Sequence, residues 1–142
     1  DMKITSRFTV AVHTLLVIYK FKDTHKTTSE FIAASVNVNP VVIRRTLLSL
    51  KAAGMVEVKA GSGGARIAKD LQDITLYDVY RAMDSVDGDL FHFHENPNPA
   101  CPVGRNIHAV LDGHLSAAQA AMENELKKVS LAELAGDLDE RE

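Results

Sequence analysis

Residues 39–69 constrain the fold of this chain more than any other segment. Asn39 and Pro40 are typical of a helix start, because asparagine accepts backbone hydrogen bonds as an N-cap and proline at the first helical position loses no needed donor. Gly54 is typical of the end of such a helix. An alternating stretch, a Gly-Ser-Gly-Gly turn and a returning stretch follow in residues 55–69. The segment therefore predicts a helix followed by an antiparallel β-hairpin.

Capping patterns predict further helices on both sides of this segment. Ser6 is a candidate N-cap for a helix that runs to about Phe21. Thr-Thr-Ser-Glu at residues 27–30 reads as a capping box, in which the first hydroxyl and the carboxylate satisfy each other's backbone donors at the start of a short second helix. Thr75 begins a similar pattern, from which we expect a helix to about Ser85.

The C-terminal part of the chain predicts one long helix. Three of the four prolines lie within residues 86–102, which we expect to form an extended loop. Residues 102–128 then form a helix about 40 Å long, at 1.5 Å per residue. Its apolar residues recur every three or four positions. They are Ile107, Leu111, Leu115, Ala118, Met122 and Leu126. We expect a last short turn capped by Ser130.

The order of elements predicts a winged helix-turn-helix, in which the second helix of the pair enters the major groove of DNA. The fold is then mainly α with a small β-hairpin and a long C-terminal dimerisation helix. With 142 residues, 46% of them hydrophobic, the chain can bury one core. We expect one compact unit with a winged helix-turn-helix in residues 1–85, a loop in residues 86–102, and a dimerisation helix with a C-terminal turn in residues 103–142.

Charge is distributed unevenly along the chain. Residues 1–69 contain 11 Lys and Arg against 4 Asp and Glu, a charge of +7, and residues 70–142 contain 5 against 15, a charge of −10. This asymmetry fits a surface that binds a polyanion beside an acidic, solvated one. Charge alone does not exclude an ordinary solvated surface.

The helix predicted for residues 40–53 has a side suited to a DNA groove. On a helical wheel Ile43, Leu47 and Leu50 form one stripe that faces the core, and Arg45 lies nearly opposite. Arginine is suited to bidentate contact with guanine, and small apolar side chains can contact thymine methyl groups. The residues that flank Arg45 are Val41, Val42 and Ser49.

Other basic residues are placed to contact phosphates. Arg44 lies at the side of the predicted helix, and the glycine-rich turn lets the hairpin tip approach a DNA backbone closely. Lys59, Arg66 and Lys69 would supply the charge of the hairpin. The alternative is that these arginines and lysines only solvate the surface.

Four stretches resemble one bacterial family. They are KITSRFTVAVHTLL, NPVVIRRTLLSLKAAGMVEVKAGSGGARIAKD, ITLYDVYRAMDSVDG and HENPNPACPVG. The first three resemble the Rrf-two family of winged-helix regulators, the group of IscR, NsrR and CymR, and the last resembles its YwnA-like branch in particular. The resemblance implies a homodimeric transcriptional regulator whose long helix pairs two subunits and whose N-terminal residues contact the DNA backbone.

With the resemblance, the set of expected DNA contacts gains the chain start and the start of the second helix. The full set is Lys3, Ser6, Arg7, Thr28, Ser29, Asn39, Val41, Val42, Arg44, Arg45, Ser49, Lys59 and Arg66.

The loop before the long helix is the expected sensing region. Cluster-binding members of the family use three cysteines there, whereas Cys101 is the single cysteine of this chain, so we expect no iron–sulfur cluster and no other cofactor. Cys101 precedes Pro102 at a helix N-terminus, where backbone dipoles favour a thiolate that could sense an oxidant. A small buried hydrophobe is the alternative. His92 and His94 lack a recognised ligand spacing, and we expect no metal.

The sequence thus predicts a homodimeric DNA-binding transcriptional regulator, a repressor on a pseudo-palindromic operator, with double-stranded DNA as its partner. An oxidant response through Cys101 is a further hypothesis. The alternative function is a winged-helix protein-interaction module that binds no DNA. An enzyme is not expected, because no orienting residue or oxyanion motif accompanies Cys101. No apolar run is long enough to cross a bilayer, and no leader sequence is apparent, so we expect a cytoplasmic protein.

Overall fold

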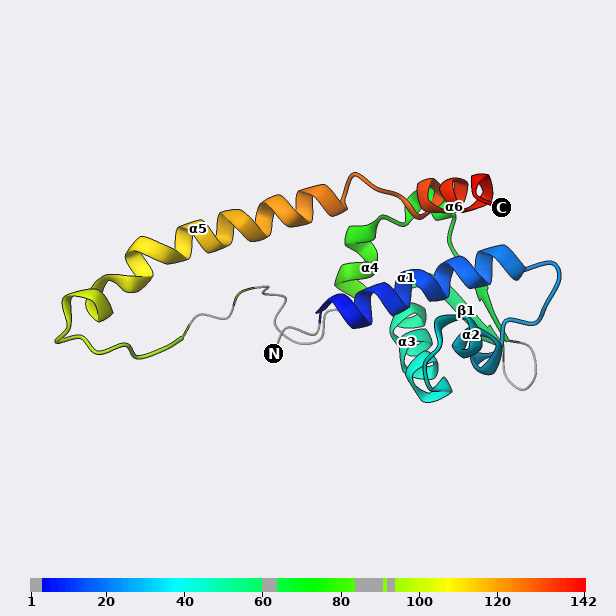
Figure 1. The fold of residues 1–142 in the computed structure, drawn as a ribbon, viewed down its shortest axis with the longest axis horizontal. Helices are drawn as coiled ribbons and strands as arrows, with labels where there is room; N and C mark the ends of the chain where they lie inside the picture. The colour runs from blue at the N-terminus through cyan, green and yellow to red at the C-terminus, as the bar shows by residue number, and fades with distance from the viewer. Residues whose placement is uncertain (1–3, 60–63, 84–90, 92–93) are drawn as a thin grey trace.

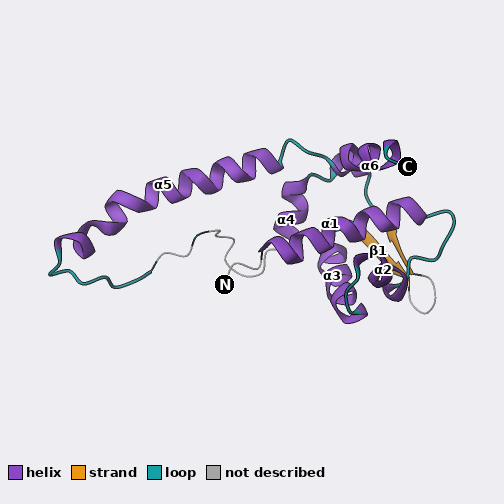
Figure 2. Ribbon diagram, viewed as in Figure 1, coloured by secondary structure: helices purple, strands orange, loops and turns teal. Residues whose placement is uncertain are grey.

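A computed structural model describes residues 4–59, 64–83, 91 and 94–142 (Figures 1 and 2). The elements in chain order are α1 (Ile4–Phe21), α2 (Ser29–Val36), α3 (Pro40–Ala52), β1 (Val56–Lys59), β2 (Gly64–Ile67), the 3-10 turn η1 (Leu71–Asp73), α4 (Leu76–Met83), α5 (Pro102–Leu126) and α6 (Leu131–Glu140). The mainly α fold with one small hairpin is confirmed. None of the described helices is both long and apolar enough to span a membrane.

The core is built around α1, which packs against α2, α3, α4, α6 and β2. Leu15 and Ile18 of α1 are completely buried, as are Ile32 of α2 and both Ile43 and Leu50 of α3. Burying a side chain of this size contributes about 1.5–3 kcal/mol. The stripe of α3 predicted to face the core therefore does so, which fixes the opposite side of α3 toward solvent.

The turn between α2 and α3 forms as the sequence predicts. Asn37 adopts the left-handed conformation with φ 65° and ends α2 by donating its backbone N–H to the carbonyl of Ala33. Asn39 caps α3, its side-chain oxygen accepting from the backbone N–H of Val41 at 2.9 Å, and Pro40 is the first helical residue. Gly54 follows the helix with φ 79°. Residues at the helix ends themselves therefore determine where α2 ends and where α3 begins and ends.

Two predicted caps are wrong. The N-cap of α2 is Thr28, whose hydroxyl accepts from the N–H of Phe31 at 3.1 Å, and not Thr27. Thr27 is buried and instead pairs with Ala65 of β2, donating its hydroxyl to the Ala65 carbonyl and accepting the Ala65 N–H at its own carbonyl. Ser6 is not an N-cap either, because α1 already begins at Ile4.

The hairpin is the wing of a winged helix. β1 and β2 are antiparallel, with Val56 opposite Ile67 and Lys59 opposite Gly64. Gly64 has φ 76°, and a Cβ atom there would lie 2.9 Å from the backbone of Thr27. Glycine is thus required where the wing passes the start of α2.

The start of α4 is capped as the sequence predicts, because Thr75 and Asp78 form a reciprocal capping box.

The C-terminal helices α5 and α6 differ in how they pack. No residue of α5 is buried, and in Figure 1 this helix extends away from the winged helix. The expected short turn after Ser130 is wrong, since α6 has ten residues and buries Leu131 and Ala135.

Candidate nucleic-acid interface

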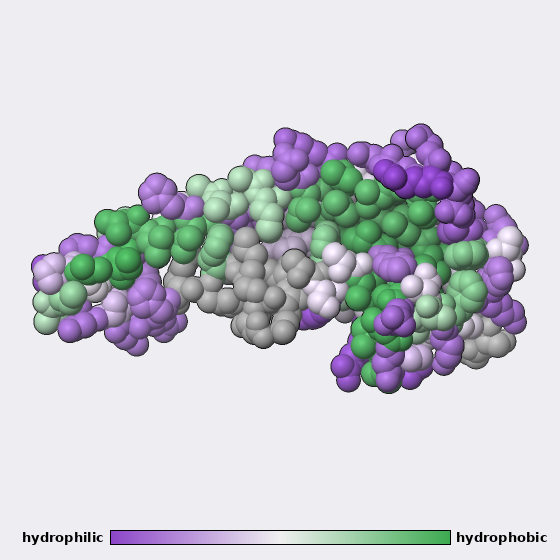
Figure 3. Space-filling view, viewed as in Figure 1, coloured by the Kyte–Doolittle hydropathy of each residue, from purple (hydrophilic) through white to green (hydrophobic). Residues whose placement is uncertain are grey.

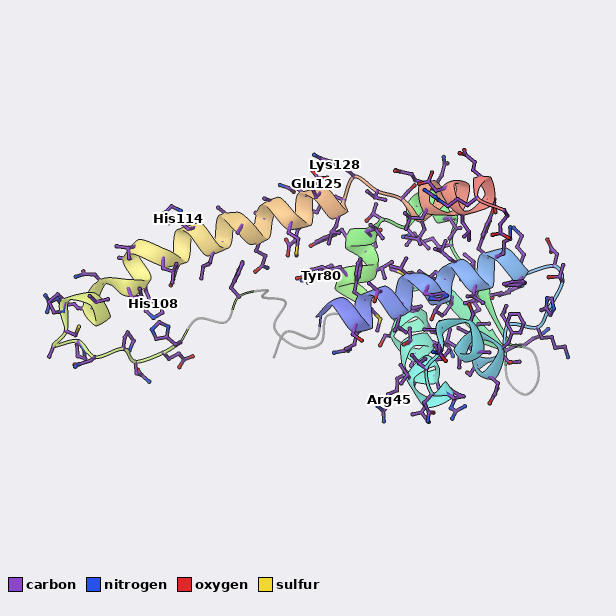
Figure 4. The ribbon with its side chains drawn as sticks, in the orientation of Figure 1. Arg45, Tyr80, His108, His114, Glu125 and Lys128 are labelled. Carbon is purple, nitrogen blue, oxygen red and sulfur yellow. The ribbon has the colours of Figure 1, made fainter. Side chains whose placement is uncertain are left out.

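The solvent side of α3 is an open, mixed basic and apolar face. Arg45 is exposed and points away from the rest of the domain in Figure 4. Val41 and Val42 are 40% and 38% exposed, and Ser49 is half-buried. Leu48, which the sequence reasoning passed over, is 66% exposed. The helical wheel that places Arg45 opposite the core also places Leu48 there.

A depression between α1 and α3 joins two groups of predicted contact residues. Its volume is about 430 Å³. Ser6, Arg7 and Val10 line it from α1, Val42, Arg45, Thr46 and Ser49 line it from α3, and Met83 closes it from α4. Among the residues that the structure describes, the lining contains two arginines and no acidic side chain. Thr46 donates its hydroxyl to the Val42 carbonyl at 2.8 Å, so the one buried hydroxyl there is satisfied.

Arg44 lies at the edge of α3 beside the start of α2. Its guanidinium is 3.5 Å from the carboxylate of Glu30, and both side chains are exposed, at 53% and 72%. An exposed pair at this distance contributes at most about 1 kcal/mol. Arg44 is therefore free to exchange Glu30 for a phosphate. Thr28 and Ser29 are half-buried in the same region, and the Thr28 hydroxyl is already engaged as the cap.

The wing carries two of the residues predicted to contact phosphates, Arg66 and Lys59, and they differ in their surroundings. Arg66 pairs across the hairpin with Glu57, with nitrogen to oxygen distances of 2.5 and 2.7 Å. Lys59 is exposed at the end of β1. Glu57 thus offsets part of the wing's positive charge in the free protein, which the sequence did not indicate. Lys3 lies outside the described residues.

Cys101 is exposed and precedes α5 as its N-cap residue. The backbone N–H groups of Gly104 and Val103 favour the thiolate and lower the pKa of the Cys101 thiol. These are the unpaired donors of the first helical turn, which stabilise a thiolate. The alternative of a small buried hydrophobe is wrong, because Cys101 is exposed.

Among the described residues, His94, His108 and Cys101 are not grouped as a metal site. His108 bonds to Asp112 one turn along α5, with Nδ1 at 2.9 Å from a carboxylate oxygen, and its ring centroid lies 5.4 Å from that of His94. Within residues 4–59, 64–83, 91 and 94–142, no three His, Cys, Asp or Glu side chains are grouped so that they could hold a metal. His92 lies outside these ranges. With one cysteine in the whole chain, the donors do not fit an iron–sulfur cluster.

The chain is similar to known proteins in sequence and in fold. The model of the Rrf2 family, described as "Iron-dependent Transcriptional regulator", matches residues 4–137. The "Putative HTH-type transcriptional regulator YwnA" of Bacillus subtilis (strain 168) is 47% identical over 135 residues, which are 95% of this chain and 98% of that protein.

Solved structures share the fold. The "Crystal structure of a putative DNA binding protein" superposes with a TM-score of 0.71 at 43% identity, over 90% of this chain and 97% of that one. IscR of T. potens superposes with a TM-score of 0.71 at 17% identity, over 96% and 88% of the two chains. The match to the family model begins with α1 and ends within α6, so it includes both the winged helix and the long helix. The chain therefore belongs to the Rrf2 family, the Rrf-two family that its sequence resembles, and is one of its transcriptional regulators.

Proposed function

We propose that the protein is a cytoplasmic, homodimeric repressor that binds a pseudo-palindromic operator through α3. The observation that carries this proposal is the open face of α3, where exposed Arg45 lines a depression together with Ser6 and Arg7, and none of the described lining residues is acidic. A recognition helix needs such a face, because base edges are read from inside the groove while flanking basic residues hold phosphates. Repression requires only that the bound dimer occupies the operator.

The unpartnered α5 supports the homodimer. This helix has 25 residues and buries none of them. Val103 is 68% exposed, Val110 63% and Leu111 37%. Figure 3 shows apolar surface along α5 that continues onto the body beside it. A helix with this much exposed apolar surface marks a protein interface. We assign it as the dimerisation helix, with a second copy of the chain as its partner.

An apolar groove on the body offers a place for the partner subunit. It has a volume of about 580 Å³. Its apolar lining comes from α1, α4 and α6, and includes Phe8, Val12, Leu16, Leu76, Leu134 and Leu138. A symmetric pair would cover this groove and α5 together. The two copies of α3 would then bind half-sites about 34–36 Å apart, which is one turn of DNA.

Replacing Arg45 is expected to relax sequence choice, whereas replacing Lys59 is expected to weaken binding to all sequences alike. Operators selected from random DNA with the wild-type protein provide the ligands, and fluorescence anisotropy gives the dissociation constants. Arg45→Ala should lose about 1–3 kcal/mol of discrimination at one base pair of each half-site. Lys59→Ala should leave the ranking of sequences unchanged, because a phosphate contact carries no sequence information.

Arg141→Ala is the matched control for the loss of one positive charge. Arg141 is exposed at the end of α6, outside the depression and the wing, and its replacement should leave both affinity and ranking unchanged. If Arg45→Ala keeps the full sequence preference, α3 does not read bases in this way. A wild-type protein that binds neither selected nor random DNA would favour the protein-interaction module instead.

We propose, second, that Cys101 makes operator binding sensitive to oxidants. A peroxide would transfer one oxygen atom to the thiolate sulfur, giving a sulfenic acid and hydroxide. Cys101 begins α5, so a change in its charge acts at the end of the proposed dimerisation helix. No iron takes part in this proposal, because the donor set does not fit a cluster.

Iodoacetamide is expected to alkylate Cys101 faster in the folded protein than in urea at pH 7. The lowered pKa raises the thiolate fraction at neutral pH, so the rate should level off at a lower pH than for the unfolded chain. Alkylation or peroxide should then weaken operator binding, and Cys101→Ser should retain binding without responding to either reagent. Equal rates in the two states would contradict the activated thiolate, and alkylation without effect on DNA binding would contradict the sensor.

A further inference from the structure

Leu48 stands out among the apolar residues of the winged helix. Its exposure of 66% exceeds that of every other large apolar residue described in residues 4–83, of which Val41 and Val58 at 40% come next. The described part of the chain leaves most of its side chain uncovered. The aliphatic residues Ile43, Leu47 and Leu50 of the same helix are all buried. A single exposed leucine is ordinary on a protein surface, so it is the position of Leu48 on α3, rather than its exposure, that indicates a contact outside the chain.

The position of Leu48 along α3 is that of a base-reading residue. Val41, Arg44, Arg45 and Leu48 are spaced i, i+3, i+4 and i+7, so they form one face of the helix, and all four are exposed. Homeodomain recognition helices use side chains at this spacing to read bases in the major groove. Leu48 lies about 4.5 Å beyond Arg45 along the helix axis, which is less than one turn.

The basic residues around Leu48 indicate which kind of ligand it can contact. Arg44 and Arg45 precede it by four and three residues, and Lys51 follows it by three, so three exposed cations surround the leucine on its own helix. A purely apolar partner would have to desolvate these charges. The major groove of DNA instead combines phosphates with one apolar group on its base edges, the C5 methyl group of thymine.

We infer that Leu48 contacts a thymine methyl group and thereby determines part of the operator sequence. This inference rests on the proposed DNA-binding function. The thymine lies in the same half-site as the guanine bound by Arg45. The separation is about one to two base pairs, given the 4.5 Å step along α3 and a rise of about 3.4 Å per base pair. Leu48 is a specificity residue in addition to those expected from the sequence.

A methyl-deletion cycle tests this inference with the full-length protein. Each thymine of the selected half-site is replaced in turn by deoxyuridine, which removes only the methyl group, and dissociation constants are measured for wild type and Leu48→Ala. At the thymine that Leu48 contacts, wild type should bind the deoxyuridine operator about fourfold more weakly per half-site, the effect of losing one buried methyl contact. Leu48→Ala should bind the thymine operator and that deoxyuridine operator equally well, whereas a loss at any thymine contacted by Val41 or Val42 should remain.

Val58→Ala is the matched control, because Val58 is also an exposed apolar residue but lies in the wing. It should retain the wild-type loss on methyl removal. Circular dichroism should give the same thermal midpoint for Leu48→Ala as for wild type, as expected for an exposed residue. If Leu48→Ala loses the same affinity as wild type at every deoxyuridine, or if no deoxyuridine weakens wild type, the inference is overturned while DNA binding stands. A wild-type protein that binds no DNA overturns both.

Discussion

Leu111→Glu is expected to convert the protein from a dimer to a monomer and to lower its affinity for a two-half-site operator by at least about 100-fold. Leu111 belongs to the apolar stripe of α5 and is already 37% exposed within one chain. A glutamate there therefore disturbs the fold of the monomer little. In a dimer, however, it would place a carboxylate in an apolar contact. Losing the paired subunit removes the gain from binding two half-sites at once, about 10²–10⁴ in affinity.

Light scattering after size-exclusion chromatography measures the first effect, and anisotropy on operators with one and two half-sites measures the second. Ser116→Glu is the matched control. Ser116 is exposed on α5 and lies on the side of the helix opposite the apolar stripe, so it adds the same charge without entering the interface. A Leu111→Glu protein that remains dimeric and binds like wild type would rule out α5 as the dimerisation helix.

Raising the salt concentration from 50 to 200 mM is expected to weaken operator binding by about 1,000-fold or more. This follows if each dimer neutralises roughly six to ten phosphates, because every neutralised phosphate releases condensed counterions. The basic residues proposed for this role are Arg7, Arg44, Lys59 and Arg66 of each subunit. Anisotropy titrations at several salt concentrations give the slope of log affinity against log salt.

Lys59→Ala tests whether the slope arises from these contacts. It should reduce the slope by about two, one for each subunit of the dimer. Glu57→Gln should strengthen binding, because it frees Arg66 from its carboxylate partner in the wing. A flat salt response would contradict a phosphate-based interface, whatever the outcome at Leu111.

The recognition helix could be predicted from sequence because its signals are local. Asn39 and Pro40 specify the start, Gly54 the end, and the apolar stripe the side that faces the core. Each signal acts within a few residues, so no knowledge of the remaining fold is needed. The capping box at Thr75 was predictable for the same reason.

The predictions for the cap of α2 and the length of α6 were wrong because contacts between distant segments determine both. Two threonines compete for the N-cap of α2, and Thr28 takes it because Thr27 is paired with Ala65, 38 residues away. The length of α6 depends on its packing with α1, where Tyr19 donates its hydroxyl to Asp139 at 2.8 Å. Nothing near Ser130 indicates that contact.

In the candidate interface, too, features set by local sequence could be predicted and features set by distant contacts could not. Arg45 was found from its angle on the helical wheel, and its exposure agrees with that angle. Leu48 shares that side of the wheel but is not among the DNA contacts predicted from the sequence. The pairs of Arg44 with Glu30 and Arg66 with Glu57 depend on helix packing and strand register, which the sequence leaves open.

Protection of guanine N7 from dimethyl sulfate on the selected operator tests the central claim most directly, since N7 lies in the major groove where Arg45 is proposed to bind. The account predicts protected guanines in two successive major grooves on one side of the duplex, about 10 base pairs apart, with both protections lost in Arg45→Ala. Protection at one site only, or bound complexes in which no N7 is protected, would contradict it.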